Sequence, residues 1–550
     1  MPAHRPRFPV VLALAALLLG GAGPAGLRAQ EPADADRAPA AGPDFRASPY
    51  LPLDHWAYDV LDRWLAAGRL EGLSPLTRPW RRRDVARALR RLDAGRLGDA
   101  GRGWLQRLRD EFRRELLRLS GGGREGPWLR GRLEAGARWR SQAHRDPMRP
   151  VLEGRFSDAT VQERVALSAA GVAGPVAGAF RFARDGQLTE DPQFPDGRVV
   201  PNKDLDLIGI EEFRARTEEG WVELQAAHAR LGFGRMDRNW GPPGVDGFTR
   251  SDYAYSWDEL SYRVGAGGIF LTGTFAALPD GDADGDTARY LAVHRLEVRP
   301  SDRLALAVSE AALHGGPDRS LDFAFVNPVG IWHLEQGEGR EANFVGQADL
   351  WWRPVDGLVL QGSLLADATN SPQTGGTSCC QMGGTVGIGL PGLVGAWSLR
   401  LEATSVQSLA YRTSLPWEEW SVEGLGMGWD EADLHRFTLE AEWLGRPGLV
   451  VRPRLDVQAR GERSDFTGDL RPESTAGFPQ VLVGEAELTV RPSVSGRWRP
   501  TAAGWGLEVR WDVGIDLIRD FRHRPGDDRE ALVGVLEATL QTPRLLVPLD

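Results

Sequence analysis

Residues 129–140 read LRGRLEAGARWR and form the most informative stretch of the chain. Its odd-numbered positions carry small or apolar side chains and end in Trp139, whereas its even-numbered positions carry arginine, glutamate or glycine. Successive side chains of a β-strand point to opposite faces, so this alternation predicts a strand with one apolar and one charged face. Charges in the middle of a strand are typical of the water-filled interior of a membrane β-barrel.

The same alternation recurs along the rest of the chain, interrupted by turn-forming clusters. A soluble β-sandwich also alternates, but the dense charge in mid-strand and the continuation over about 425 residues, from 126 to 550, favour a large antiparallel transmembrane β-barrel. At roughly 24 residues for a strand and its connection, this length predicts about 18 strands. The clearest further strands are 397–404, 437–443, 449–458 and 505–516, the clearest turns are 446–448 and 525–527, and the last strand is expected at 532–540 with a short tail after it.

The composition agrees with a barrel rather than with a soluble enzyme. The 550 residues include 67 Gly and 20 Trp but only two Cys. Tryptophan gathers at the two interfaces of a membrane, and barrels hide their hydrophobicity by alternation. No apolar run of about 18 residues follows residue 20, so no transmembrane helix is expected. The formal net charge of −10 argues against a nucleic-acid partner, which would favour a basic patch.

The N-terminus predicts an exported protein. Arg5 and Arg7 precede an apolar run over 10–19, and Leu27-Arg28-Ala29 offers a cleavage site, so residues 1–29 are interpreted as a signal peptide. A membrane anchor is the alternative, but ten apolar residues are far short of the ~20 that span a bilayer. Residues 30–49 are rich in Ala, Pro and Asp and are expected to be a flexible leader.

Residues 50–120 predict a small three-helix bundle ahead of the barrel. Apolar side chains recur at helical spacing over 53–67, 81–92 and 102–119. Asp54 is expected to cap the first helix and Gly68 to end it. About 70 residues are marginal for independent stability, so the bundle is expected to dock on the barrel.

Two aromatic motifs are candidate binding sites. Arg238-Asn239-Trp240 lies between strand-like stretches, and it offers a flat ring and hydrogen-bond donors to a saccharide. The interpretation that we favour is a fold-back loop inside the barrel that never touches ligand. Trp332 follows Asn327-Pro328, for which a structural turn is the favoured interpretation and a saccharide contact the alternative.

Two other motifs are weaker candidates, one for a calcium site and one for a disulfide. Residues 280–286 match the opening of a calcium loop, but Leu291 stands where the closing glutamate is needed, so an acidic solvated loop is favoured over a calcium site. Cys379 and Cys380 are adjacent in an oxidising compartment, where a strained disulfide is conceivable and a metal site is not expected. No metal and no cofactor are therefore predicted.

Several stretches resemble the Wzi family of capsule-assembly outer-membrane proteins. They are PLDHWAY at 52–58, LSPLTR at 73–78, GRMDRNWGP at 234–242, FVNPVG at 325–330 and NFVG at 343–346. The resemblance implies an 18-stranded barrel with a periplasmic helical bundle. It also implies that the protein binds capsular or other surface polysaccharide and holds it at the cell surface.

The first functional hypothesis is therefore a non-catalytic, lectin-like barrel of the outer membrane, in contact with its lipid and lipopolysaccharide and inserted by the barrel-assembly machinery. The alternative is a porin or substrate-selective channel. An enzyme is not expected, because the chain contains no G-x-S-x-G, no H-E-x-x-H and no P-loop lysine. The candidate polysaccharide-binding residues are Arg238, Asn239, Trp240 and Trp332.

Overall fold

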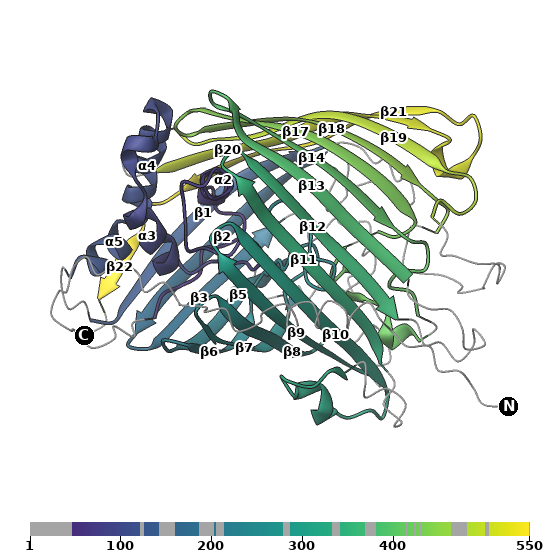
Figure 1. Cartoon of the computed structure of the whole chain (residues 1–550), viewed down its shortest axis with the longest axis horizontal. Helices are drawn as coiled ribbons and strands as arrows, with labels where there is room; N and C mark the ends of the chain where they lie inside the picture. The colour runs from purple at the N-terminus through teal and green to yellow at the C-terminus, as the bar shows by residue number, and fades with distance from the viewer. Residues whose placement is uncertain are drawn as a thin grey trace, which may run out of the picture. The chain divides into compact units, whose positions relative to one another are not determined.

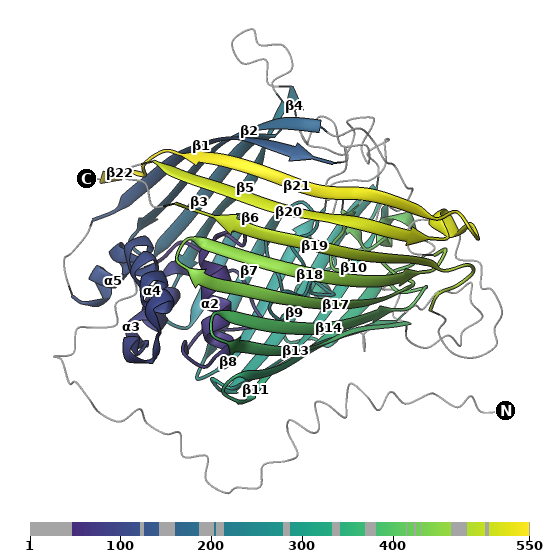
Figure 2. The same ribbon diagram turned by 90° about the horizontal axis from the view of Figure 1, so that it is seen from above.

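The structure is a computed structural model, and it is a closed antiparallel β-barrel with helices at one end (Figures 1 and 2). Its core is a ring of eighteen strands that closes between the first and the last of them, β1 and β21. The predicted fold class and strand number are thus confirmed. The residues that the structure describes are 47–121, 126–141, 160–185, 203–204, 214–278, 287–332, 342–368, 381–413, 415–422, 425–429, 431–463, 481–500 and 505–548.

The strands follow one another around the ring in chain order, each paired antiparallel with its neighbours. The strands of the ring are β1 (Trp128–Arg140), β2 (Thr160–Ala173), β3 (Val176–Asp185), β5 (Arg214–Gln225), β6 (Ala229–Arg235), β7 (Asp258–Ala266), β8 (Ile269–Ala277), β9 (Thr287–Ser301), β10 (Leu304–Pro317), β11 (Asn343–Val355), β12 (Leu358–Ala368), β13 (Gln381–Val394), β14 (Trp397–Val406), β17 (Leu434–Arg446), β18 (Leu449–Arg460), β19 (Glu487–Trp498), β20 (Gly506–Arg519) and β21 (Arg529–Gln541). Short β4 (Lys203–Asp204) pairs with β5.

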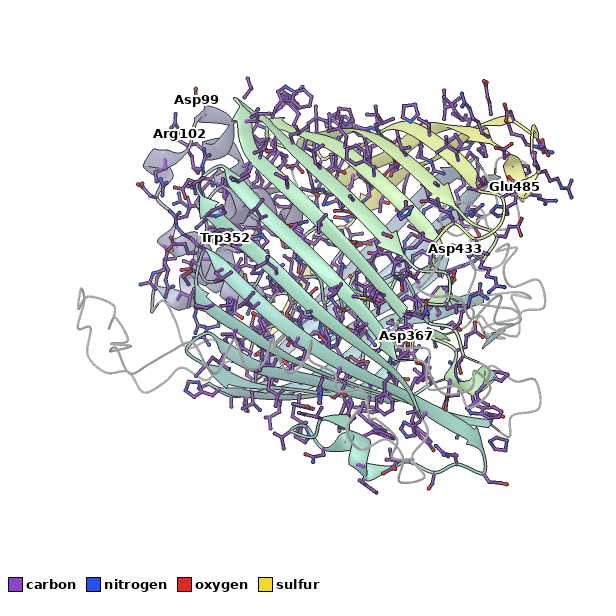
Figure 3. All side chains as sticks on the ribbon, turned by 45° about the vertical axis from the view of Figure 1, so that its right-hand side comes forward. Asp99, Arg102, Trp352, Asp367, Asp433 and Glu485 are labelled. Carbon is purple, nitrogen blue, oxygen red and sulfur yellow. The ribbon has the colours of Figure 1, made fainter. Side chains whose placement is uncertain are left out.

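The two ends of the barrel differ in the length of their connections. At the end that carries the helices, strands are joined by short turns such as 356–357 and 447–448. The connections at the other end are all longer, among them 236–257, 318–342 and 407–433. Figure 3 shows Asp99 and Arg102 at the helical end and Asp433 and Glu485 at the opposite end. This asymmetry is typical of barrels with short periplasmic turns and long outer loops.

Alternation along the strands places apolar side chains on the outside. Leu133 and Leu167 are paired across β1 and β2 and are 46% and 50% exposed on the outer face. Trp397 and Trp498 are also exposed on strands, and both stand at strand ends beside the short turns. An apolar outer face with tryptophans near the ends of its strands is what a barrel in a lipid bilayer requires.

The described residues 47–121, which we call the N-terminal segment, contain four helices instead of the three expected. They are α2 (Ala57–Ala66), α3 (Arg82–Arg91), α4 (Asp99–Glu111) and α5 (Arg113–Leu119), with a 3₁₀ turn, η1, at Ala94–Arg96. The third predicted helix is broken at Phe112, which is fully buried beneath the guanidinium of Arg82. No helix among the described residues is long and apolar enough to cross a membrane.

The expected cap of the first helix is wrong. Asp54 does not cap α2, which starts three residues later and has no side-chain cap. Asp54 instead forms an ion pair with Arg181 of β3 at 3.2 Å. Gly68 does end the helix, with a φ of 69° that favours glycine.

The helices pack against the barrel through a shared apolar core. Trp104 and Leu108 of α4 belong to one buried cluster with Trp351, Leu444 and Val450 of the barrel wall. The indole nitrogen of Trp104 donates to the backbone carbonyl of Leu444 at 3.0 Å. Residues Phe45–Asp550 form one compact unit, so the helices and the barrel are packed together rather than joined by a linker.

The last predicted strand is longer in the structure, and the tail after it also forms a strand. The last ring strand, β21, covers and slightly exceeds the predicted 532–540. The expected tail is not a free end, because β22 (Leu545–Pro548) pairs with Trp128–Gly131 at the beginning of β1. The tail has no clear alternation in its sequence. It pairs with the first residues of β1, because β21 pairs only with the later part of β1, from Glu134 to Arg140.

Candidate functional site

The lumen of the barrel is the candidate site, and its helical end is occupied by the N-terminal segment. Asp59 of α2 forms ion pairs with Arg452 at 2.8 Å and with Arg497 at 3.0 Å, on two strands of the wall. Burial alone would raise the pKa of Asp59, but Arg497 and Arg452 outweigh it and lower the pKa. On another part of the wall, the hydroxyl of Tyr50 donates to the Glu223 carboxylate at 2.9 Å. The segment is therefore fixed to the wall by charge-assisted contacts.

Two long connections from the opposite end fold into the lumen and pack on each other. The hydroxyl of Tyr411 donates to the carbonyl of Phe248 at 2.8 Å, and the backbone amide of Ser251 donates to the backbone carbonyl of Met427 at 2.9 Å. Connection 407–433 contains a small hairpin of β15 (Ser421–Val422) and β16 (Leu425–Gly426). We call this body the inner loop core; its buried apolar residues are Trp240, Phe248, Tyr253, Ala254, Tyr255, Trp257, Ala410, Tyr411, Trp420, Val422, Leu425, Met427, Trp429 and Ala432.

The inner loop core and the N-terminal segment meet inside the barrel. The amide of Arg78 donates to the carbonyl of Asn239 at 3.1 Å. Arg295 of β9 donates to the carbonyl of Leu76 at 3.1 Å and pairs with Asp349 of β11 at 2.7 Å. The side chains of Arg295 and Asp349 are completely buried. Two bodies of protein thus fill much of the lumen and share buried polar contacts.

The motif Arg238-Asn239-Trp240 lies within the inner loop core. Trp240 is fully buried, and its carbonyl accepts a hydrogen bond from Gln347 at 2.6 Å. Arg238 pairs with buried Glu259 of β7 at 2.5 Å. The side-chain amide of Asn239 bonds to the backbone further along the same loop, donating to the carbonyl of Val245 and accepting from the amide of Gly247. In this conformation the three residues hold the loop inside the barrel.

Trp332 lies far from this motif in the fold, on the outer wall. Its ring stacks on His294 of β9 with 4.0 Å between centroids, and its amide donates to the carboxylate of Glu310 of β10 at 3.0 Å. His294 and Glu310 alternate with lumen residues such as Arg295, so they face outward. The connection after β10, with η2 at Phe323–Val326, therefore covers a polar pair on the lipid side of the wall. The structure does not bring Trp332 together with Arg238, Asn239 or Trp240.

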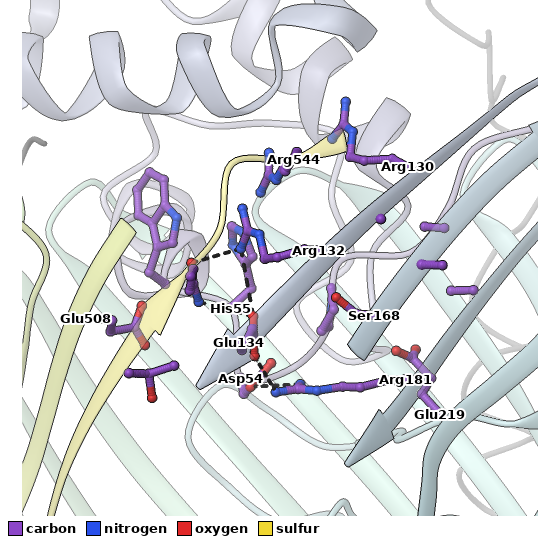
Figure 4. Close-up of a pocket in the computed structure, with 18 of the residues that line it drawn as sticks. Asp54, His55, Arg130, Arg132, Glu134, Ser168, Arg181, Glu219, Glu508 and Arg544 are labelled. Atoms are coloured by element: carbon purple, nitrogen blue, oxygen red, sulfur yellow. Dashed lines mark hydrogen bonds and ion pairs between the residues drawn. The ribbon is translucent and has the colours of Figure 1, made fainter. Parts of the chain in front are cut away.

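Two cavities remain between the N-terminal segment and the wall. One has a volume of about 380 Å³ and the other about 390 Å³. Both border Asp54, Arg181 and Glu219, so they adjoin along the strands that begin and end the ring. Figure 4 shows these three residues in the lining of the first cavity. Space remains there because the inward side chains of β2 and β3 include small ones such as Ser168 and Ala179. Charged side chains of the wall, such as Arg138 and Glu537, line both cavities.

His55 lines the first cavity and gives a pH-dependent prediction. Burial lowers the pKa of His55 to about 4, although Glu111 at 3.5 Å opposes the shift. Between pH 6.5 and 4 the unfolded chain takes up a proton that the folded protein refuses, so stability falls as pH falls through this window. We expect the melting temperature of His55→Asn to change less over this window than that of the parent. Identical pH profiles for the two proteins would contradict this assignment.

Several predicted features lie outside the described residues. These are the signal peptide, the acidic loop 280–286, and Cys379 with Cys380. Other site residues were missed by sequence reasoning, notably Asp59 and the inner loop 407–433. The available signal was the pair of closely spaced tryptophans, Trp420 and Trp429, between two predicted strands. Tryptophan is usually buried, so two of them in one connection indicate that the connection packs against protein.

The fold and the filled lumen define the class of large transmembrane β-barrels. The chain has the fold of Wzi from Escherichia coli, with a TM-score of 0.57 and 12% identity over 90% of this chain and 99% of that one. That protein is described as a carbohydrate-binding β-barrel of the outer membrane that is involved in group 1 capsule assembly.

Further solved structures are similar to a smaller part of the chain. The OccK5 (OpdH) protein of Pseudomonas aeruginosa is 10% identical over 76% of this chain and 98% of that one, with a TM-score of only 0.39. No family model and no curated protein sequence matches the chain. At 12% identity, the likeness to Wzi establishes the fold alone.

Proposed function

We propose that this protein is a non-catalytic barrel of the outer membrane that binds surface polysaccharide and holds it at the cell surface. The observation that carries the proposal is the filled lumen, in which the N-terminal segment and the inner loop core meet through Arg78 and Asn239. A barrel closed in this way is poorly suited to bulk diffusion. It is well suited to displaying long connections at the end opposite the helices. The likeness of the whole chain to a carbohydrate-binding barrel supports the same role.

The proposed orientation places the helical segment in the periplasm. Short turns such as 447–448 share the helical end, and barrels of the outer membrane keep their short turns on the periplasmic side. The strand ends from which the long connections leave, such as Pro317 of β10 and Arg460 of β18, then face the cell exterior. A polysaccharide outside the cell would meet these connections first.

Arg238, Asn239, Trp240 and Trp332 remain the proposed polysaccharide-binding residues, with a condition that their burial imposes. Trp240 and Trp332 are 0% and 2% exposed, so neither ring can stack on a sugar unless its connection moves. Their effect on binding would otherwise pass through the shape of the connections that they hold. In both cases their removal should weaken binding at the outer end.

The test is polysaccharide retention by a double variant, Arg238→Ala with Trp240→Ala. We expect retention of the host strain's surface polysaccharide to fall by about tenfold or more, because the inner loop core loses a buried ring and one of the two arginine partners of Glu259, with Arg250 remaining. Binding of purified polysaccharide to the protein in detergent is the measurement. The matched control is Arg303→Ala with Trp397→Ala, which alters an exposed turn and the lipid face. Equal retention by both variants, with both barrels folded, would remove the motif from the proposed site.

A channel is the second candidate, because the two adjoining cavities leave polar space along the wall. Conductance of the purified protein in a planar bilayer separates the two functions. A closed barrel that binds polysaccharide supports the first proposal. Large, steady conductance without polysaccharide binding would replace it with the channel.

A further inference from the structure

The cavity of about 380 Å³ has two parts with different charge balance. In its inner part the charges are matched: Arg181 pairs with Asp54 at 3.2 Å, and Arg138 pairs with Glu537 at 2.8 Å. The part nearest the helices is lined by Arg130 and Arg132 of β1 and by Arg544, which follows β21 (Figure 4). We call these three arginines the basic mouth.

The basic mouth has more positive charge than its carboxylates can neutralise. Arg544 pairs with Glu111 at 2.6 Å, and Arg82, which shares that carboxylate, also pairs with Glu115 at 2.7 Å. These two arginines and two glutamates balance, so the excess positive charge lies on Arg130 and Arg132. Arg132 donates to the neutral side chain of Gln541 at 2.9 Å and is 3.9 Å from Glu134.

Arg130 is the least neutralised of the three. Among the described residues, no carboxylate lies within ion-pair distance of it, and its contact is the ring of Trp128 at 5.5 Å. Arg544 repels both Arg130 and Arg132, and Glu111 attracts both of them without forming an ion pair with either. Cations gathered beside a cavity repel one another unless an anion joins them.

We propose that the basic mouth binds an anionic group, a carboxylate or a phosphate, carried by a small molecule or by a saccharide residue. Guanidinium groups bind both through paired N–H donors in a planar fork, which a neutral sugar cannot match. A cavity of about 380 Å³ lies within the roughly 300–1,000 Å³ of ligand pockets. The site stands at the helical end, remote from the long connections, so it does not depend on polysaccharide binding at the other end.

Isothermal titration of the mature protein in detergent, at low ionic strength, tests the proposal with three probes: inorganic phosphate, glucuronate and glucose. We expect one or both anions to bind and glucose not to bind. The variant Arg130→Gln with Arg132→Gln should weaken anion binding by about tenfold or more. Arg454→Gln is the matched control, because Arg454 is also in the lumen but is paired with Asp456 at 2.7 Å.

The pattern of binding identifies the source of the anion. Binding of phosphate alone assigns a phosphate group, and binding of glucuronate alone assigns a carboxylate. The variant Arg130→Lys with Arg132→Lys keeps the charge and loses the planar fork, so its affinity should fall between those of the parent and the Gln variant. It also serves if the Gln variant does not fold. The proposal is overturned if neither anion binds, if glucose binds as well as glucuronate, or if all folded variants bind as the parent does.

Discussion

Replacing Leu108 with aspartate should unfold the helical segment while the eighteen-stranded ring stays closed. Leu108 is completely buried among side chains of the helices and of the barrel wall. A carboxylate there has no partner and would lose its hydration, which costs roughly 4 kcal/mol or more. We expect this cost to exceed the free energy of unfolding of the helical segment, because that segment is stable only when it is docked against the barrel.

The ring should survive because its backbone ladders are made entirely between its own strands, although the helices also contact the wall. β1 and β21 close it through an antiparallel ladder from Glu134–Gln541 to Arg140–Val535. Protease sensitivity of residues 50–120, together with heat-modifiable migration of the barrel on a gel, measures the two parts separately. Leu117→Asp is the control, since Leu117 lies on α5 and is 53% exposed. A Leu108→Asp barrel that fails to insert would show instead that helices and barrel fold as one unit.

Replacing Asp349 with alanine should be among the most destabilising changes inside the lumen. Its carboxylate pairs with Arg295 at 2.7 Å, and both side chains are fully buried. Removing one partner of a buried pair leaves a charge without compensation and costs about 3–5 kcal/mol. Arg295 also donates a hydrogen bond to the carbonyl of Leu76, so the substitution should weaken the contact between the wall and the N-terminal segment as well.

Thermal melting in detergent measures the effect, and a second substitution distinguishes the causes. Adding Arg295→Met to Asp349→Ala removes the stranded charge and should recover much of the lost stability. The exposed pair between Arg303 and Asp356 provides the control, where Asp356→Ala should cost at most about 1 kcal/mol. No recovery in the double variant would mean that packing around Asp349, not charge, sets the cost.

The strands could be read from the sequence because their cause is local. Each predicted strand, including 129–140 and 449–458, alternates apolar and charged residues within its own length, and β1 and β18 are found there. The lipid outside and the polar lumen inside fix the two faces of every strand alike. Short turns then pair neighbouring strands at the helical end, and long connections join the remaining neighbours at the opposite end.

The helical segment was predicted in part, and its departures have tertiary causes. The apolar stripe of 102–119 is continuous, yet the helix breaks at Phe112, where Arg82 lies over the buried ring. Asp54 has the chemistry of a helix cap, but the arginines of the wall bind it instead. In neither case does the neighbouring sequence contain the group that decides the outcome.

The sequence by itself determined the barrel, its strand number and the faces of its strands, because alternation with a period of two is a property of consecutive residues. Only the tertiary structure decided the paths of the long connections. The loop of Trp240 turns into the lumen and that of Trp332 lies against the outer wall, although both combine an aromatic ring with nearby polar residues. Each path is fixed by partners more than twenty residues away, Gln347 for the first and Glu310 for the second, and such pairings are invisible to local pattern.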